Sequence, residues 1–495
     1  MTDSTMATQP SQTKHMLLSV TGMSPAVVTE TLYGIAQRKK AGDQNAHWPD
    51  EIRIITTSDG KKELINPSEW QGGEKNNVAK RIQEVCELVE LPVIQLHDEH
   101  ILVVPNANGK PVDDARETDD HEALADFITT VVRYFTQDEQ RWSIHASIAG
   151  GRKTMTFYLG YAMSLFGRHG DQMSHVLVSK DFEGGGFFYP YQKDNDSYEI
   201  KVNGKVLDSR CAKIELTDIP FIRMRHQLPK VLTDDMAVRG EGEGEYEYFK
   251  AHKLNYRNLV DLINLGDQPS EIRLHVDLIK RELVISNKYK KLESVSFKNQ
   301  MHWAFYYQFL LDTNLHSGNR QDYQRPPKSG VDSDNILFCM TCSTLFDLLN
   351  VRHSGNQYFE TLVDVYEGRA DVEDSKLLEE LSNTRRSIAY FLNGKRKSKE
   401  EIKKMDEAGK YGNTLHFEGE PMPEKAFDSF ITGIRDSLRE KLPDNMVGLL
   451  KPSLRDTTVD IEPDDDIEFK EKFKSYLLGV KPGNITFIRN VDADS

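Results

Sequence analysis

The sequence predicts an α/β fold in which a doubly wound sheet of parallel strands precedes a second, mainly helical region. Between residues 16 and 230, short apolar runs alternate with longer runs in which apolar residues recur at helical spacing. Two of the apolar runs end in glycine-containing turns that lead into helix-like segments. Past residue 239 the alternation gives way to a glycine- and glutamate-rich stretch and then to mainly helical patterns. Strand-helix alternation of this kind predicts a parallel sheet covered by helices on both faces.

The first predicted strand is "MLLSV", residues 16–20, whose continuous apolar character is typical of a buried strand. The segment "TGMSPAVVTETLYGIAQ" follows it. Gly22 permits a turn there, and we expect Ser24 to be the N-cap and Pro25 the first residue of an amphipathic helix.

Further strands and helices alternate down to residue 190. They are predicted as a strand ending in a turn at 51–60, a helix at 78–89, a strand at 101–105, a helix at 122–136, a strand at 142–151, a helix at 155–166, and strands at 173–179 and 187–190. This order predicts a Rossmann-like domain, in which ligands bind beyond the carboxyl ends of the strands, near the point where the strand order reverses.

The second region begins after the hinge-like stretch "RGEGEGEYEYF", residues 239–249. Its predicted parts are two short strands and a helix within 271–310, a mainly helical stretch at 336–394, a charged insertion at 395–424, a helix at 427–442 and a terminal hairpin at 474–488. Strands, two helices and a terminal hairpin are the parts of a winged helix. The predicted domains are a disordered lead-in at 1–15, a first domain at 16–235, a hinge at 236–250, and a winged-helix-like domain at 251–495 with an insertion near 320–424.

Composition limits the classes of function. The chain has 495 residues, a formal net charge of −15 and four cysteines. The acidic balance argues against nonspecific nucleic-acid binding, which depends on a basic surface, and favours a small anionic ligand in a local basic pocket. The chain has no apolar run of the ~20 residues that a membrane span needs, so no membrane partner is expected. The few cysteines favour a reducing cytoplasm.

The stretch "SIAGGRKTM", residues 147–155, carries the strongest local signal for a site. Gly150 and Gly151 allow a sharp turn after a strand, and Arg152, Lys153 and Thr154 follow where a helix begins. This arrangement predicts an anion bound at a helix N-terminus. The spacing fits neither the P-loop nor the dinucleotide fingerprint. A tight structural turn with solvated basic residues remains the alternative.

Several blocks together resemble the CRISPR-associated Rossmann-fold (CARF) sensor domains of type III CRISPR systems, and among them the NE-family and ring-nuclease branch. The blocks are "LLSVTGMSPAVVTETLYGI", "IRIITTSDG", "SIAGGRKTMTFYLGYAMSLFGR", "DQMSHVLVS", "FFYP" and "ELTDIPFIRMR", and they cover roughly residues 16–230. The resemblance implies a symmetric homodimer that binds a cyclic oligoadenylate on its two-fold axis. We expect the tetramer as the ring, and ring-nuclease members also cleave it. The C-terminal half more faintly resembles the interrupted winged-helix region of this branch.

The resemblance also implies site residues. Ring-nuclease members use a serine after the first strand and a lysine after the double glycine, which correspond to Ser24 and Lys153 as catalytic residues. The expected ligand-binding residues are Thr21, Gly22, Met23, Gly150, Gly151, Arg152, Thr154 and Arg116. Each residue also has a possible structural role that involves no ligand. Ser24 would then be a helix N-cap, Lys153 a solvated side chain, Arg152 the partner of an acidic neighbour, and Arg116 part of a solvated turn.

Ring cleavage of this type needs no metal and no cofactor, so none is expected. A ribose 2′-hydroxyl attacks the adjacent phosphorus, which leaves a 2′,3′-cyclic phosphate and a free 5′-hydroxyl. The protein has to align the reacting atoms and stabilise the charge that develops on the phosphoryl oxygens. Lys153 would supply a positive charge, and Ser24 would bind the phosphate or orient the 2′-hydroxyl.

Two other motifs carry less weight. Cys339 and Cys342 form a C-x-x-C without a second pair, so two buried thiols on one helix are favoured over a zinc site. The stretch "NTRRSIAYFLNG" resembles the R-x4-6-H motif of HEPN ribonucleases, but Tyr390 stands where the histidine would follow Arg385. We therefore expect that helix to be structural or degenerate.

Three functions are compatible with this sequence. The first, which we favour, is a ring nuclease that degrades the cyclic messenger. The second is a ribonuclease effector that the messenger activates, and the missing HEPN histidine counts against it. The third is a ligand-responsive regulator that uses a winged helix, and the acidic stretch "EPDDDIEFKE", residues 462–471, counts against DNA as its target.

Overall fold

The computed structural model divides the chain into two compact units, one formed by residues 1–228 and 232–257 and the other by residues 229–231 and 258–495. Each unit is described by itself. The structure describes residues 13–66, 77–137, 141–183, 187–190, 198–202, 204–233, 244–315, 319–328, 335–352, 357–367, 369–370, 384, 387–392, 394–395, 416–417, 421–460 and 470–488.

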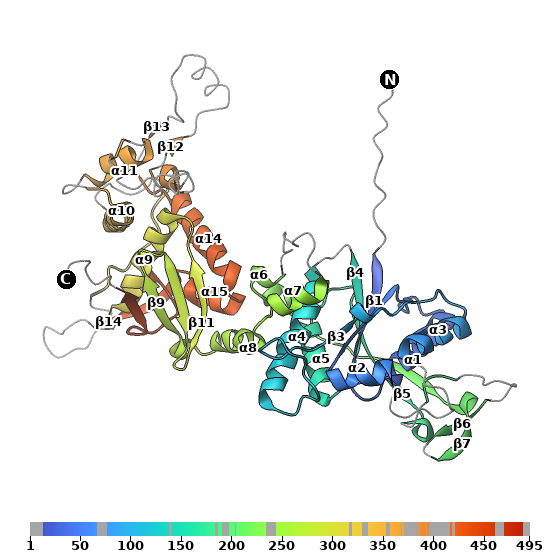
Figure 1. Ribbon diagram of the computed structural model, residues 1–495. Helices are drawn as coiled ribbons and strands as arrows, with labels where there is room; N and C mark the ends of the chain where they lie inside the picture. The colour runs from blue at the N-terminus through green and yellow to red at the C-terminus, as the bar shows by residue number, and fades with distance from the viewer. Residues whose placement is uncertain are drawn as a thin grey trace, which may run out of the picture. The chain divides into compact units, whose positions relative to one another are not determined.

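The N-terminal unit is built on one six-stranded sheet with the order β3-β2-β1-β4-β5-β8 (Figure 1). Its strands are β1 (Lys14–Val20), β2 (Glu51–Thr56), β3 (Ile101–Val103), β4 (Trp142–Ser147), β5 (Gln172–Val178) and β8 (Ile214–Asp218). The first five are parallel, and β8 runs antiparallel to β5 at the edge. The α/β class and the parallel sheet are confirmed.

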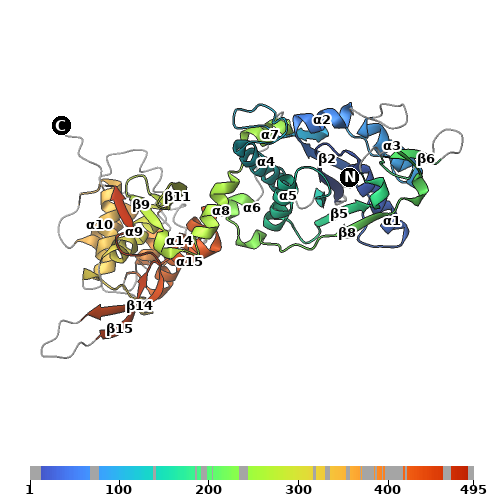
Figure 2. The same cartoon turned by 90° about the horizontal axis from the view of Figure 1, so that it is seen from below.

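Helices cover both faces of this sheet, as seen from two directions in Figures 1 and 2. They are α1 (Ala26–Lys40), α2 (Ser58–Ile65), α3 (Val78–Val89), α4 (Thr118–Gln137) and α5 (Lys153–Phe166). The helices α1 and α3 pack together on one face, and α4 and α5 pack together on the other. The strand order reverses between β1 and β4, so the segments after these two strands emerge side by side at the switch point.

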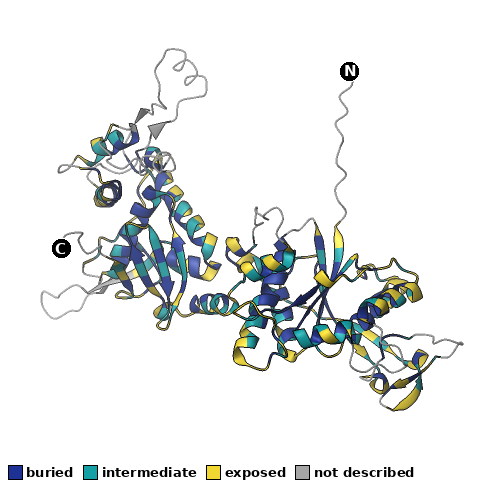
Figure 3. Ribbon diagram, in the orientation of Figure 1, coloured by how far each residue is buried: buried dark blue, intermediate teal, exposed yellow. Residues whose placement is uncertain are grey.

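The sheet interior explains why β1 is so apolar. Met16, Leu17, Leu18 and Val20 are fully buried, because a central parallel strand has helices above and below it. In Figure 3 the central strands are largely buried, while exposed residues lie on the outer sides of the helices.

Four local features of this unit differ from the sequence prediction. Residues 187–190 are not a strand, although Phe187, Phe188 and Tyr189 are buried. The turn expected at residues 57–60 is the start of α2. A hairpin of β6 (Glu199–Val202) and β7 (Lys205–Asp208) was not predicted. The expected hinge at 236–250 overlaps the helix α7 (Glu245–Ala251), which packs on α4. Residues 236–243 of that hinge, and residues 1–12 of the lead-in, lie outside the described residues.

The C-terminal unit contains a four-stranded sheet with the order β11-β10-β9-β16. Its strands are β9 (Arg273–Asp277), β10 (Glu282–Ser286), β11 (Lys291–Ser296) and β16 (Ile485–Ile488). The described helices of this unit include α9 (Gln300–Asn314), α10 (Ile336–Leu349), α11 (Tyr358–Glu367), α14 (Glu424–Lys441) and α15 (Asp444–Leu450). Trp303, Phe305 and Phe309 on α9 join strand and helix residues in one hydrophobic core.

The terminal hairpin predicted at 474–488 is wrong. β15 (Lys470–Leu477) pairs with β14 (Ser453–Asp460), whereas β16 leaves it and pairs parallel with β9. In this pairing, the Leu274 amide donates a hydrogen bond to the Asn484 carbonyl, and Leu274 lies opposite Ile485 in the register. The winged-helix description of this region therefore stays a prediction. Most of the expected insertion at 395–424 lies outside the described residues. Within the described part of the chain, no helix is long and apolar enough to span a membrane.

Candidate functional site

The two predicted glycine loops meet at the carboxyl ends of β1 and β4. A Cβ placed on Gly150 would lie 2.8 Å from the Val20 carbonyl oxygen and 3.3 Å from the Thr21 Cα. A Cβ on Gly22 would lie 3.5 Å from the Gly151 Cα. The second loop therefore approaches the first closely enough that only glycine fits at residue 150 without displacement.

The first loop is held by its own hydrogen bonds. The Thr21 hydroxyl is buried and donates to the Ser24 carbonyl at 3.0 Å, and the Thr21 amide donates to the Ile55 carbonyl. No side chain caps the start of α1, so the N-cap hydrogen bond expected from Ser24 is not formed. Ser24 is exposed, and Met23 beside it is 60% exposed. The Ser24 hydroxyl thus faces solvent at the start of a helix.

The second loop presents Lys153 at the first position of α5. Gly151 has a φ of +80°, which lets the chain turn from β4 into the helix. No side chain caps α5, and Lys153 is exposed. In the part of the chain that the structure describes, no acid pairs with the Lys153 ammonium group. A helix N-terminus repels a cation, so an uncompensated lysine at this position favours a bound anion.

Thr154 and Arg152 are engaged differently. The Thr154 hydroxyl oxygen is buried and has no hydrogen-bond partner among the described residues. The Arg152 guanidinium lies 2.6 Å from a carboxylate oxygen of Asp114, so this arginine does pair with an acidic neighbour. Asp114 also accepts a hydrogen bond of 2.7 Å from Arg116. These two arginines, Arg152 first, hold the pKa of the Asp114 carboxyl below its ordinary value.

The ion pair between Asp114 and Arg152 brings the segment around Arg116 to the same edge of the sheet as the glycine loops. Arg116 itself is exposed. The structure therefore gathers all ten sequence-predicted residues around the ends of β1 and β4, although it shows no contact of Arg116 with either glycine loop.

The sequence analysis missed the contribution of α2 to this edge. A Cβ on Gly60 would lie 3.2 Å from the Gly22 carbonyl oxygen, so α2 starts against the first loop. The Thr57 side chain caps α2 by accepting from the Gly60 amide. The Ser58 and Asp59 amides donate to the carbonyls of Val112 and Asp113, which attaches the segment before Asp114 to the helix. The signal was Thr57 followed by Ser58 and Asp59, a typical helix start.

The C-x-x-C motif and the HEPN-like stretch belong to the C-terminal unit, not to the unit that holds the glycine loops. Cys339 and Cys342 are free thiols on α10, and burial raises the pKa of Cys342. Cys342 is buried, whereas Cys339 is only partly buried. Among the described residues, no group of histidine, cysteine, aspartate or glutamate side chains is placed to hold a metal ion. Arg385 lies outside the described residues, and Tyr390 is 48% exposed.

Comparison with known proteins identifies the N-terminal unit. The family model described as CRISPR-associated protein NE0113 matches residues 24–252. These residues are similar to that CRISPR-associated family. The NE-family resemblance is thereby confirmed over residues 24–252, which begin at Ser24 in the first glycine loop and include the second loop. No curated protein matches the chain.

A solved structure similar to this chain is Enterococcus italicus Csm6 bound to cyclic hexa-2′-fluoro-hexa-dAMP. Its sequence identity is 12%, its TM-score is 0.24, and the match covers 89% of this chain and 83% of the Csm6 chain.

Proposed function

We propose that this chain binds a cyclic oligoadenylate as a homodimer and opens the ring, which would end a type III CRISPR signal. The observation that carries the proposal is the meeting of the two glycine loops at the switch point of the sheet, with the Lys153 ammonium group uncompensated at the start of α5. The Csm6 structure with a bound cyclic oligonucleotide analogue is consistent with this ligand class.

The proposed chemistry uses the ligand's own hydroxyl group. A ribose 2′-oxygen bonds to the adjacent phosphorus and the bond from phosphorus to the 5′-oxygen breaks. The 2′-hydroxyl proton is lost and the 5′-oxygen gains one, so the ring opens without consuming water. Lys153 stabilises the negative charge on the phosphoryl oxygens or on the departing 5′-oxygen. The exposed Ser24 hydroxyl binds the phosphate or orients the 2′-hydroxyl.

Two exposed apolar side chains beside the loops support the dimer. Met23 is 60% exposed on the first loop, and Phe157 is 59% exposed one helical turn beyond Lys153. Large apolar side chains next to polar site residues are typical of surfaces that a partner covers. A second copy of the chain would cover them and would supply a second Lys153 to a ring on the two-fold axis.

The test is incubation of the purified protein with labelled cyclic tri-, tetra- and hexa-adenylate, with and without EDTA. We expect binding and opening of the tetramer to a linear product that carries a 2′,3′-cyclic phosphate, and no effect of EDTA. Absence of binding for every ring at about 50 µM, a concentration that detects dissociation constants in the micromolar range, would contradict the sensor function. If the protein binds a ring but does not open it, the sensor function stands and the ring-nuclease function is rejected.

A further inference from the structure

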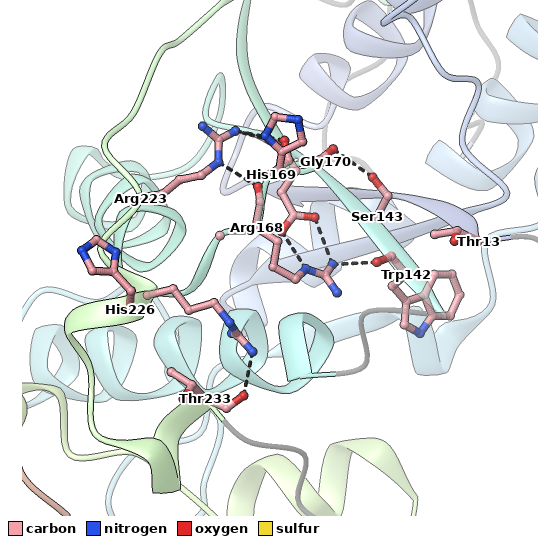
Figure 4. Close-up of a pocket in the computed structure, with 12 residues that line it drawn as sticks. Thr13, Trp142, Ser143, Arg168, His169, Gly170, Arg223, His226 and Thr233 are labelled. Atoms are coloured by element: carbon pink, nitrogen blue, oxygen red, sulfur yellow. Dashed lines mark hydrogen bonds and ion pairs between the residues drawn. The ribbon is translucent and has the colours of Figure 1, made fainter. Parts of the chain in front are cut away.

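Arginine side chains contribute to a pocket at the amino ends of the strands of the N-terminal sheet, whereas the glycine loops lie at the carboxyl ends. Figure 4 shows this pocket, which has a volume of about 750 Å³. Its lining residues are Thr13, Trp142, Ser143, Gly167, Arg168, His169, Gly170, Asp171, Arg223, Arg225, His226 and Thr233. Thr13 precedes β1 and Trp142 begins β4, so the pocket lies at the amino ends of these strands. The seven residues of β1 therefore separate it from the first glycine loop by about 20 Å.

Among the described lining residues, Asp171 supplies the only carboxylate, and this carboxylate is already fully engaged. Both oxygens of Asp171 accept from the Arg168 side chain, at 2.9 and 3.0 Å. Asp171 also accepts from the amides of Ile144 and Arg168. The Arg168 side chain and the Asp171 side chain are 10% and 1% exposed, so they form a buried, electrically balanced pair in the wall of the pocket.

Arg223 brings a positive charge to the pocket that no carboxylate of the described residues balances. Its hydrogen bonds go to the backbone carbonyls of Arg168, His169 and Asp171. Arg225 likewise donates to the carbonyls of Phe166 and Thr233. Carbonyl groups are dipoles, so they orient the Arg223 guanidinium group but leave its net charge in place. Among the described residues, Arg223 therefore brings an unbalanced positive charge to the pocket, in a chain whose formal net charge is −15.

Arg223 is exposed, but its side chain is held in place by contacts within the protein. Arg223 stacks over the Phe221 ring with its guanidinium carbon 4.5 Å from the ring centroid, and the carbonyl contacts restrain its remaining freedom. Gly167 permits this arrangement, since a Cβ there would lie 2.8 Å from a ring carbon of Phe221. Figure 4 shows Arg168, Arg223, His169 and His226 around the pocket. A guanidinium held in place binds phosphate with little loss of side-chain entropy.

We propose that this pocket binds a phosphate group carried by a small molecule, at a site separate from the glycine loops. The volume lies within the range of about 300–1,000 Å³ that is usual for small-molecule pockets, and it is large enough for a nucleotide. An arginine held in place and not paired with an acid of the described residues, as Arg223 is, supplies the charged donor that phosphate oxygens require. The pocket arginines hold the turn between α5 and β5, so a bound phosphate would also stabilise that turn.

The experiment measures binding of inorganic phosphate, adenosine monophosphate and adenosine to the full chain by titration calorimetry. We expect the monophosphate to bind and adenosine not to bind. Inorganic phosphate that binds as well as the monophosphate would identify free phosphate as the ligand, whereas a stronger monophosphate would identify a nucleotide. Failure of both phosphates to bind at millimolar concentration would overturn the proposal.

Variants localise the site. Arg223→Gln removes the charge, and we expect the dissociation constant for the monophosphate to rise at least about tenfold, as for loss of one charged hydrogen bond. His226→Glu places a negative charge at an exposed lining residue without touching the carbonyl bonds of Arg223, and we expect a similar rise. If Arg223→Gln fails to fold, His226→Glu decides the question. Equal binding by the wild type and His226→Glu would overturn the proposal.

Two controls separate this site from a general charge effect and from the glycine loops. Arg210→Gln removes an arginine that also stacks on a tyrosine, Tyr198, but that pairs with Asp208 away from the pocket. We expect it to bind the monophosphate like the wild type. Lys153→Ala should also retain this binding. Loss of binding in Lys153→Ala with retention in His226→Glu would assign the monophosphate to the glycine loops and reject the pocket.

Discussion

Lys153 begins α5 with no acidic partner among the described residues, and its ammonium group is therefore available to a phosphate. If it stabilises the cleavage transition state, Lys153→Ala should reduce the single-turnover rate by about 10²–10³, roughly 2.7–4 kcal/mol. The affinity for the ring should fall less, because helix amides and Ser24 remain. Ser24→Ala should slow cleavage by a smaller factor.

The matched control for this prediction is Lys40→Ala, which removes an exposed lysine at the far end of α1. Single-turnover cleavage of labelled ring and a binding titration are measured for each variant. A Lys153→Ala protein that binds and cleaves like the wild type would remove this loop from the mechanism.

Asp114 balances the charge of Arg152, so it competes with any phosphate for that guanidinium. Asp114→Asn retains an oxygen that accepts from Arg152 but removes the negative charge. We therefore expect tighter ring binding, by a factor of about 1.5–5, a gain in the range of one exposed ion pair. Affinity measured at low and at 0.5 M salt checks this, because added salt should reduce the difference. Weaker binding by the variant would show that Asp114 positions Arg152 for the ligand.

The loop after β4 approaches β1 so closely that residue 150 has to be glycine. In Gly150→Ala the new methyl group would lie 2.7 Å from Cγ2 of Val27 and 2.8 Å from the Val20 carbonyl oxygen. The two loops would have to separate, which we expect to cost about 1–3 kcal/mol of unfolding free energy and to abolish ring binding.

Gly160→Ala in α5 is the control for that substitution. Its Cβ would meet only Met173, at 3.6 Å from the sulfur, which is an ordinary contact. Alanine in a helix interior is favoured over glycine by about 1 kcal/mol, so this variant should be more stable and should still bind the ring. Chemical denaturation measures the free energy of unfolding of both variants and of the wild type. Equal stability of Gly150→Ala and the wild type would mean that the loops adjust without cost.

The pairing of β4 with β5 places the partly buried His145 beside the buried Ser174, with a ring nitrogen 2.6 Å from the Ser174 hydroxyl oxygen. Burial lowers the pKa of His145 from 6.5 to about 4. As the pH falls below 6.5, the unfolded chain takes up this proton and the folded chain does not. The folded state therefore loses up to about 1.4 kcal/mol per pH unit until the pH reaches the folded pKa.

Between pH 7 and pH 4.5 we expect His145 to shift thermal unfolding of the N-terminal unit toward lower temperature, so His145→Asn should lose less stability over this range than the wild type. Burial raises the pKa of Glu30 to about 7, which acts in the opposite direction in both proteins, so the difference between them reports on His145. His175→Asn, next to Ser174 on β5, is the control and should leave the shift unchanged. Burial also lowers the pKa of His302 in the C-terminal unit to about 4. This histidine should likewise reduce the stability of the C-terminal unit as the pH falls below 6.5, independently of His145. A His145→Asn protein with the full wild-type shift would contradict the assignment.

A dimer built over the glycine loops would bind one ring for every two chains. Phe157 should then lie in the contact between copies. Phe157→Asp should weaken both dimerisation and ring binding, because an exposed apolar anchor becomes charged and the charge repels phosphate.

Leu177→Asp is the control for this variant, since Leu177 is a comparably exposed apolar residue, at 51%, on β5. Light scattering gives the mass of the full chain, and calorimetry gives the stoichiometry of the ring. A monomer that binds one ring per chain, or a Phe157→Asp protein that stays dimeric and binds normally, would overturn the arrangement.

Local sequence was sufficient for the alternation of strands and helices in the N-terminal unit and for the two glycine loops. Residues 16–20 and 78–89 carry patterns whose period follows from the geometry of a single strand or helix, so a short window of sequence specifies them. Gly150 and Gly151 were recognisable because few other residues permit such a turn. The resemblance of several blocks in order then identified the family, which the family model confirmed.

Tertiary structure alone decided which distant segments meet. The neighbouring positions of β1 and β4, the ion pair of Asp114 with Arg152 and the pairing of β16 with β9 join residues far apart in the chain. The basic pocket likewise collects residues from β4, the turn after α5 and the segment after β8. Short-range preferences contain no information about such partners, because the choice among possible pairings depends on how the whole core packs. The sequence by itself therefore determined the loops and their chemistry. Packing decided that the loops meet and that a pocket with three arginines lies at the other end of the same strands.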